Sequence, residues 1–207
     1  MSKTIITAAV LVFSAAAYAN PISLSQVNGN LYQQTVQSPC IFVNPSCQQG
    51  SFTGTDLPTG GGVNGYNAFA SYSGSTLLSI IGAGNSLQLG LDINQASGQP
   101  AQTLSLFTMA INGNVVDTFS FAGAGNVPAG NNGNGYADYL LGNFSSFLST
   151  DTIQFHFVFN DANDGTENVF LIGVPGTPTS IPEPTSLALL GSGLLIVAAK
   201  FRKKAKI

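Results

Sequence analysis

LSLFTMAINGNVVDTFSF, residues 104–121, contains two runs rich in apolar and β-branched residues. Asn112-Gly113-Asn114 separates the runs, and Asn and Gly readily adopt the positive φ angles that a tight hairpin turn requires. The pattern therefore predicts a β-hairpin in which residues 104–111 pair with residues 115–121.

Three other segments have the pattern of strands. Residues 86–94 and residues 152–160 alternate apolar with polar side chains, which is typical of strands with one buried face. Residues 169–174 form a short apolar run. Residues 136–148 are the one helical candidate, and because Gly142-Asn143 interrupts them we expect a strand followed by a single helical turn.

Short strands separated by Gly-rich turns predict an all-β fold. We expect residues 20–174 to form one extracytoplasmic β-sandwich, with jelly-roll-like connections between its strands. About 155 residues are enough for one hydrophobic core.

The charges are distributed very unevenly. The chain has 207 residues, of which only 7% are charged, and its mean hydropathy is +0.26. Residues 20–180 contain no Lys or Arg but eight carboxylates: Asp56, Asp92, Asp117, Asp138, Asp151, Asp161, Asp164 and Glu167. Because nucleic-acid and polyphosphate binding need basic side chains, the composition excludes those partners.

The N-terminal segment has the organisation of a secretory signal peptide. Lys3 precedes a mostly apolar run, and Ala17-Tyr18-Ala19 places small residues at the two positions that signal peptidase reads. We therefore expect residues 1–19 to be removed before Asn20. The alternative is an N-terminal membrane anchor, for which the run is short.

The C-terminal segment has three parts. Residues 175–184 are a Pro-rich linker, and an apolar run extends through Ala199. A basic stop that contains Arg202, Lys203 and Lys204 follows. The pattern predicts a single transmembrane helix and basic tail in residues 185–207, with the body outside the cytoplasm because basic residues favour the cytoplasmic side. A buried core helix with a solvated basic end is the alternative.

These parts together resemble the PEP-CTERM sorting signal of Gram-negative bacteria. The resemblance covers residues 181–207, and its sorting motif is Pro182-Glu183-Pro184. It implies recognition and cleavage by exosortase, a transient anchor in the inner membrane, and a place in the cell envelope or extracellular matrix. It also implies an association with exopolysaccharide and biofilm formation.

Export also bears on the two cysteines. Because secreted proteins meet an oxidising environment, we expect Cys40 and Cys47 to form a disulfide. A catalytic or metal-binding role is the alternative, although the chain has no other Cys and only one His.

The densest polar segment, residues 160–168, is a candidate calcium loop. Asp161, Asn163, Asp164 and Glu167 supply oxygen atoms of the kind that Ca²⁺ prefers. The alternative is a solvated turn in which Asn and Asp side chains bond the local backbone.

No motif points to an enzyme. The chain lacks the usual nucleophile and zinc motifs, and nothing marks a pair of carboxylates for glycoside hydrolysis. We therefore expect a non-catalytic envelope or matrix protein. The alternative is a calcium-assisted, lectin-like carbohydrate-binding module, for which five tyrosines are candidate sugar platforms: Tyr32, Tyr66, Tyr72, Tyr136 and Tyr139.

Overall fold

A computed structural model describes most of the predicted body of the protein. The described residues are 19–42, 47, 52, 65–128, 131–162, 165 and 167–176. Contacts divide the chain into a unit that ends at Pro175 and a second unit, Gly176–Ile207. The fold described here is that of the first unit.

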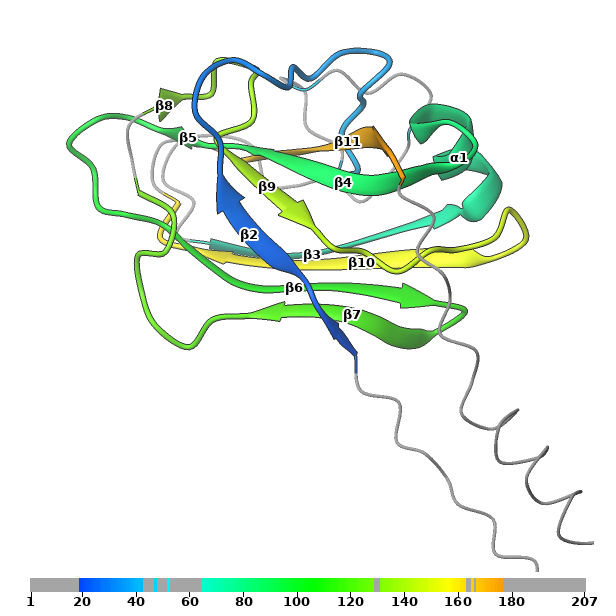
Figure 1. The fold of residues 1–207 in the computed structure, drawn as a ribbon. Coiled ribbons are helices and arrows are strands. Elements are labelled where there is room, and N and C mark those ends of the chain that lie inside the picture. Colours follow the sequence, from blue (N-terminus) through cyan, green and yellow to red (C-terminus); the bar gives the residue numbers. More distant parts are fainter. Residues whose placement is uncertain are drawn as a thin grey trace, which may run out of the picture. The chain divides into compact units, whose positions relative to one another are not determined.

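The first unit is built mainly from two β-sheets (Figure 1). The five-stranded sheet has the order β1-β7-β6-β10-β3. Its strands are β1 (Asn20–Pro21), β7 (Asn114–Ser120), β6 (Thr103–Ile111), β10 (Thr152–Asn160) and β3 (Gly65–Ser73). β1 pairs with β7 in parallel, and the other neighbours are antiparallel.

The second sheet has four strands in the order β11-β4-β9-β2. They are β11 (Asn168–Pro175), β4 (Asn85–Asp92), β9 (Tyr139–Gly142) and β2 (Ser23–Gln26). A small two-stranded sheet joins β5 (Asn94–Gln95) to β8 (Asn131–Asn132). Among the longer strands, each connection along the chain leads from one sheet to the other, except the β6–β7 hairpin, which stays within the five-stranded sheet.

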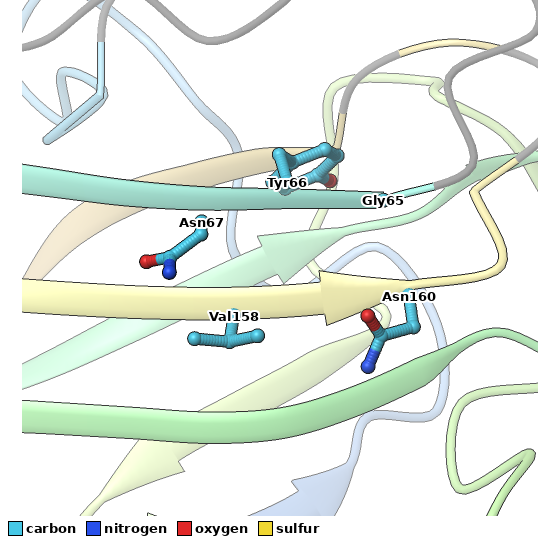
Figure 2. Close-up of a pocket in the computed structure, with 5 residues that line it drawn as sticks. All are labelled: Gly65, Tyr66, Asn67, Val158 and Asn160. Carbon is cyan, nitrogen blue, oxygen red and sulfur yellow. The ribbon is translucent and has the colours of Figure 1, made fainter.

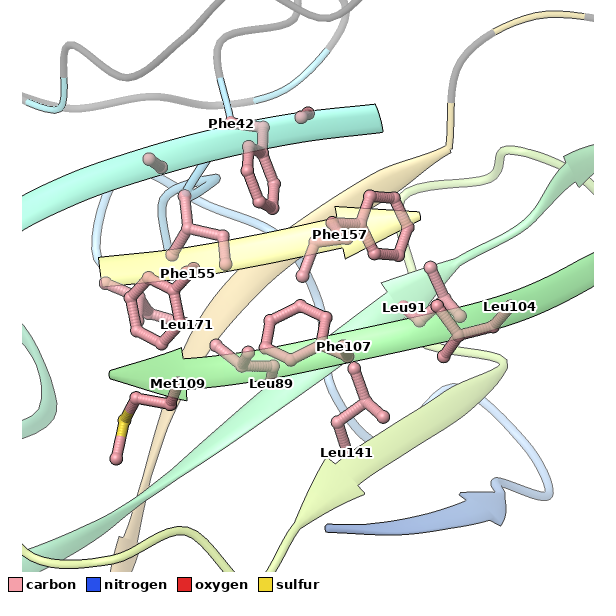
Figure 3. Close-up of a cluster of buried hydrophobic side chains, with 14 of the residues drawn as sticks. Phe42, Leu89, Leu91, Leu104, Phe107, Met109, Leu141, Phe155, Phe157 and Leu171 are labelled. Atoms are coloured by element: carbon pink, nitrogen blue, oxygen red, sulfur yellow. The ribbon is translucent and has the colours of Figure 1, made fainter. Parts of the chain in front are cut away.

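One hydrophobic core lies between the two sheets (Figure 3). The five-stranded sheet contributes Phe107, Phe155 and Phe157, and the four-stranded sheet contributes Leu89 and Leu141. All five side chains are buried. The strict alternation of β10 places every second side chain in this core, which leaves the others on the outer face of the sheet.

The strand predictions are confirmed. The hairpin forms between β6 and β7, and Asn112 and Gly113 have φ angles of 52° and 84°. β10 has the bounds predicted from its alternation. β4 and β11 overlap the two other predicted strands and pair with each other.

The helical turn predicted within residues 136–148 is wrong. The segment contains strand β9, but no helix follows it. Asn143 has a φ of 69°, and the backbone N–H groups of Ser145 and Leu148 donate to the carboxylates of Asp117 and Asp151. The two carboxylates thus accept from backbone N–H groups that would otherwise bond to backbone carbonyl oxygens in a helical turn.

No pattern in the sequence predicted the helix α1 (Gly74–Ile81), which is the one helix among the described residues. Ser73 caps its N-terminus by accepting a hydrogen bond from the backbone N–H of Thr76, and Gly82 ends it with a φ of 87°. Both are standard helix boundary signals. At eight residues, the helix is too short for a clear periodic pattern.

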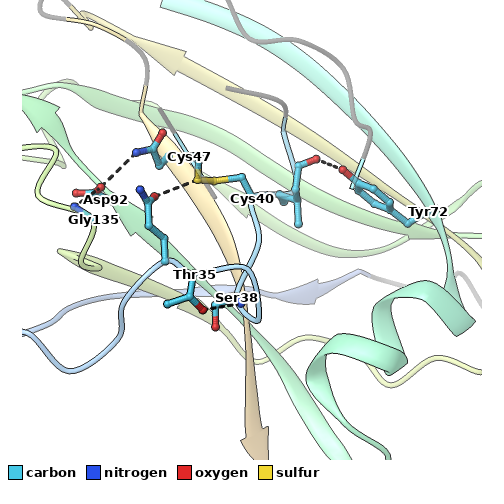
Figure 4. Close-up of a disulfide and its surroundings, with 10 residues drawn as sticks. Thr35, Ser38, Cys40, Cys47, Tyr72, Asp92 and Gly135 are labelled. Carbon is cyan, nitrogen blue, oxygen red and sulfur yellow. Dashed lines mark hydrogen bonds between the residues drawn. A yellow bond between two sulfur atoms is a disulfide. The ribbon is translucent and has the colours of Figure 1, made fainter. Parts of the chain in front are cut away.

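The predicted Cys40–Cys47 disulfide is confirmed (Figure 4). Both cysteines are buried, and they pack with Phe170 and Ile172 of β11 in a second, smaller hydrophobic cluster. Next to Cys40, the backbone oxygen of Ile41 accepts a hydrogen bond from the Tyr72 hydroxyl. The disulfide segment is thereby attached to both sheets.

Candidate functional site

A groove opens on the outer face of the five-stranded sheet, between β3 and β10 (Figure 2). Its volume is about 350 Å³, and it is lined by Gly65, Tyr66, Asn67, Val158 and Asn160. This volume is at the lower end of the ~300–1,000 Å³ typical of ligand sites. The lining contains no charged side chain.

Glycine at one end of the groove leaves room for a neighbouring side chain. Gly65 lies directly opposite Asn160 in the β3–β10 ladder and has a φ of 152°. A Cβ atom at this position would lie 2.6 Å from the Phe159 backbone oxygen and 3.3 Å from Asn160 Oδ1. Asn160 Oδ1 therefore lies toward the β3 side of the groove.

A β-bulge positions the other end of the Asn160 amide. The register between β10 and β6 shifts at Val158/Phe159, which leaves Ser105 as the extra residue on β6. Ser105 Oγ accepts a hydrogen bond of 3.0 Å from Asn160 Nδ2 and donates one of 3.2 Å to the Val158 backbone oxygen. Bulges commonly redirect a side chain in this way next to functional sites.

An aromatic pair stands beside the groove. Phe69 and His156 are directly opposite in the ladder, and their rings stack with centroids 4.1 Å apart and planes 9° apart. Phe69 is 57% exposed, so its ring is accessible from solvent. His156 Nε2 donates to Asn67 Oδ1 at 2.6 Å with the amide in this orientation, which connects the ring pair to the groove.

This face is electrically neutral around the ring pair. Partial burial lowers the pKa of His156, so the imidazole is uncharged at neutral pH. Gln154 and Ser71 extend the same polar face along β10 and β3. The arrangement offers one exposed ring, hydrogen-bonding amides and no ionic group.

The described residues among those predicted to hold calcium differ from one another in burial. Asp161 is exposed at the end of β10, where its Oδ2 accepts a hydrogen bond from Thr103 Oγ1. Glu167 is fully buried, and Asn163 and Asp164 lie outside the described residues. Within the described ranges, no three His, Cys, Asp or Glu side chains gather closely enough to hold a metal ion. The calcium loop stays a prediction.

Glu167 belongs to a buried polar network. Its carboxyl accepts hydrogen bonds from Gln102 Nε2 and from the backbone N–H of Asn94. Its own backbone N–H donates to the Tyr66 hydroxyl beneath the groove. Burial, the main cause, raises the pKa of Glu167 to about 8, and burial also raises the pKa of Asp92 to about 6.

The aromatic platform is not one of the five tyrosines considered in the sequence. Of those five, Tyr66, Tyr72 and Tyr139 are buried, and Tyr32 and Tyr136 are half-buried and lie outside the groove lining. Phe69 is the exposed ring beside the groove, and the sequence does carry a signal for it. In GYNAFASYS, residues 65–73, buried and exposed positions alternate, and Phe69 falls among the exposed positions with Asn67 and Ser71.

Both ends of the chain lie largely outside the described residues. This includes residues 1–18, the sorting motif Pro182, Glu183 and Pro184, and the basic stop Arg202, Lys203 and Lys204. Of the helices in the described part, none has the length and apolar character needed to span a bilayer.

Comparison with known proteins identifies the C-terminal segment. Residues 180–204 match the family described as the PEP-CTERM protein-sorting motif. No curated protein and no solved structure matches the chain. The motif implies an exported protein of the cell envelope with exosortase as its processing partner. The chain is therefore a PEP-CTERM sorting domain-containing protein.

Proposed function

We propose that this chain is a non-catalytic protein of the cell envelope or extracellular matrix, and that it associates with exopolysaccharide or biofilm. The sorting motif at residues 180–204 is the observation that carries this proposal. The body suits such a place because it has few charges and its outer sheet face presents neutral polar groups. Neutral amide and hydroxyl groups exchange hydrogen bonds with a hydrated polymer at low desolvation cost.

Signal peptidase is the second processing partner in this proposal. Cleavage before Asn20 leaves the fold intact, because β1 starts at Asn20. Asn20 is exposed, but its Nδ2 donates a hydrogen bond of 2.7 Å to Ser145 Oγ, which links this residue to the body.

Residues 185–207 then act as a single transmembrane helix with a basic tail, before exosortase removes them. The basic residues favour the cytoplasmic side, so the body is held outside the cytoplasm. We also propose that the sandwich is jelly-roll-like, which is supported by a chain that alternates between the two sheets.

A calcium-assisted, lectin-like module is the second candidate function. The groove beside Phe69 favours it, because an exposed ring next to hydrogen-bonding amides is the type of surface on which sugars pack. Ca²⁺ would be held by the loop that contains Asp161, Asn163, Asp164 and Glu167.

Substitution of the central motif residue tests the sorting proposal. In a host with exosortase, we expect Glu183→Ala to leave a full-length, membrane-retained product, whereas Thr179→Ala, outside the matched segment, is processed normally. Mass spectrometry of both mature termini measures this. Normal processing of Glu183→Ala would contradict the proposal.

A further inference from the structure

We propose that the groove between β3 and β10, together with the Phe69 ring, binds an uncharged polysaccharide. One sugar ring packs on Phe69, and its hydroxyls or those of the next sugar bond to Asn67 and Asn160. This inference names the site and the ligand class of the proposed matrix function, and it rests on that function.

The exposed ring supplies the contact that discriminates sugars from other neutral polymers. Phe69 lies on β3, the edge strand of its sheet, and is 57% exposed. A pyranose has an apolar face of C–H groups, and the face of an aromatic ring carries the negative end of its quadrupole. The stacked His156 imidazole fixes the orientation of the Phe69 ring, so little conformational entropy is lost on binding.

The two amides present complementary groups to hydroxyls. Asn67 uses its Oδ1 to accept from His156, which leaves Nδ2 to donate to a ligand. Asn160 uses its Nδ2 to donate to Ser105, which leaves Oδ1 to accept, and this atom lies on the Gly65 side of the groove. A sugar hydroxyl both donates and accepts, so neighbouring hydroxyls match this pair.

The distribution of charge favours a neutral polymer as the ligand of the groove. Residues 20–180 contain eight carboxylates and no Lys or Arg, so an anionic polysaccharide or a phosphate polymer meets repulsion and no counter-charge. The groove itself is lined by uncharged residues, and the imidazole beside it is neutral at pH 7. A cationic partner would gain nothing from these uncharged groups and would be attracted only to carboxylates outside the groove lining, such as Asp161.

Affinity electrophoresis with the full-length chain in detergent tests the proposal. The gels contain dextran, laminarin or galactomannan as neutral probes and alginate as the anionic probe. We expect retardation by at least one neutral polymer and none by alginate. Phe69→Ala should weaken binding at least about tenfold, the equivalent of about 1.4 kcal/mol. Phe69→Trp keeps an aromatic face and should retain binding.

Leu148→Ala is the matched control, because Leu148 is 69% exposed and is not one of the residues that line the groove. It should bind as the unsubstituted chain does. Thermal unfolding of each variant checks that the fold is unchanged.

Three results would overturn the proposal: no retardation by any neutral probe, equal binding by Phe69→Ala and Leu148→Ala, or self-association that only Phe69→Ala abolishes. The last result would assign this face to a second copy of the chain. Glycan binding does not need exosortase, so normal processing of Glu183→Ala would remove the sorting proposal and leave the binding result standing.

Discussion

Gln102 Nε2 donates a hydrogen bond of 2.6 Å to Glu167 Oε1, and both side chains are fully buried. The sequence places no Lys or Arg between residues 4 and 199, so no Lys or Arg among the described residues can compensate this carboxyl. Burial raises the pKa of Glu167 to about 8, which makes the proton its main means of neutralisation.

We therefore predict that stability falls as pH rises from about 4.5 to about 8. Because the pKa is raised on folding, the native state binds more protons than the unfolded state in this window, and the free energy of unfolding decreases with pH. The loss is on the order of a few kcal/mol at about 1.4 kcal/mol per pKa unit. Urea unfolding at pH 5 and at pH 8.5 measures it. Equal stability at the two values would contradict the raised pKa.

Glu167→Gln should remove most of this pH dependence, because the amide cannot ionise. Asp161→Asn is the matched control: Asp161 is exposed, and Asn tolerates its positive φ of 65°. The control variant should keep the slope of the unsubstituted chain. A slope unchanged by Glu167→Gln would assign the effect to other buried groups, Asp92 among them.

Removal of calcium tests the predicted loop at residues 161–167. If the loop holds Ca²⁺ with millimolar affinity, 10 mM Ca²⁺ should stabilise the protein by about 1.4 kcal/mol, which corresponds to a rise in Tm of a few degrees. Asp164→Asn should abolish the rise. Identical melting curves in EGTA and in Ca²⁺ would discard the site.

Loss of the Cys40–Cys47 disulfide should destabilise the sandwich. The bond closes a loop between residues seven positions apart, for which chain entropy gives about 2–3 kcal/mol. Urea unfolding of a Cys40→Ser/Cys47→Ser double variant measures this loss. A reducing agent should lower the stability of the unsubstituted protein and leave the double variant unchanged. An equally stable double variant would show that packing alone holds this segment.

Truncation of two aromatic residues of the same sheet should change the free energy of unfolding by very different amounts. Phe157 is fully buried in the shared core, so Phe157→Ala should cost about 3–5 kcal/mol. Phe69→Ala on the exposed face should change stability by no more than about 0.5 kcal/mol. Comparable losses for both would mean that Phe69 is part of the core, which would also remove the basis of the binding site.

The sequence by itself determined β4, β6, β7, β10, β11 and the sorting address, but it did not predict β3, the strand that carries Phe69. Local alternation specified β10, and the Asn-Gly turn specified the β6–β7 hairpin, because backbone period and turn geometry depend on near neighbours. The motif at residues 180–204 is likewise a linear signal.

Only the tertiary structure decided what faces the groove and what is buried. Phe69 meets His156 across 87 residues because β3 and β10 pair, and no local pattern contains that pairing. The sequence predicted Glu167 as a calcium ligand in a loop, and the tertiary structure buries its side chain in a hydrogen-bonded network with Gln102. The helical turn after β9 failed in part for the same reason, since the Asp117 carboxylate on β7 took the backbone N–H of Ser145. Long-range contacts, which a linear pattern does not encode, set these outcomes.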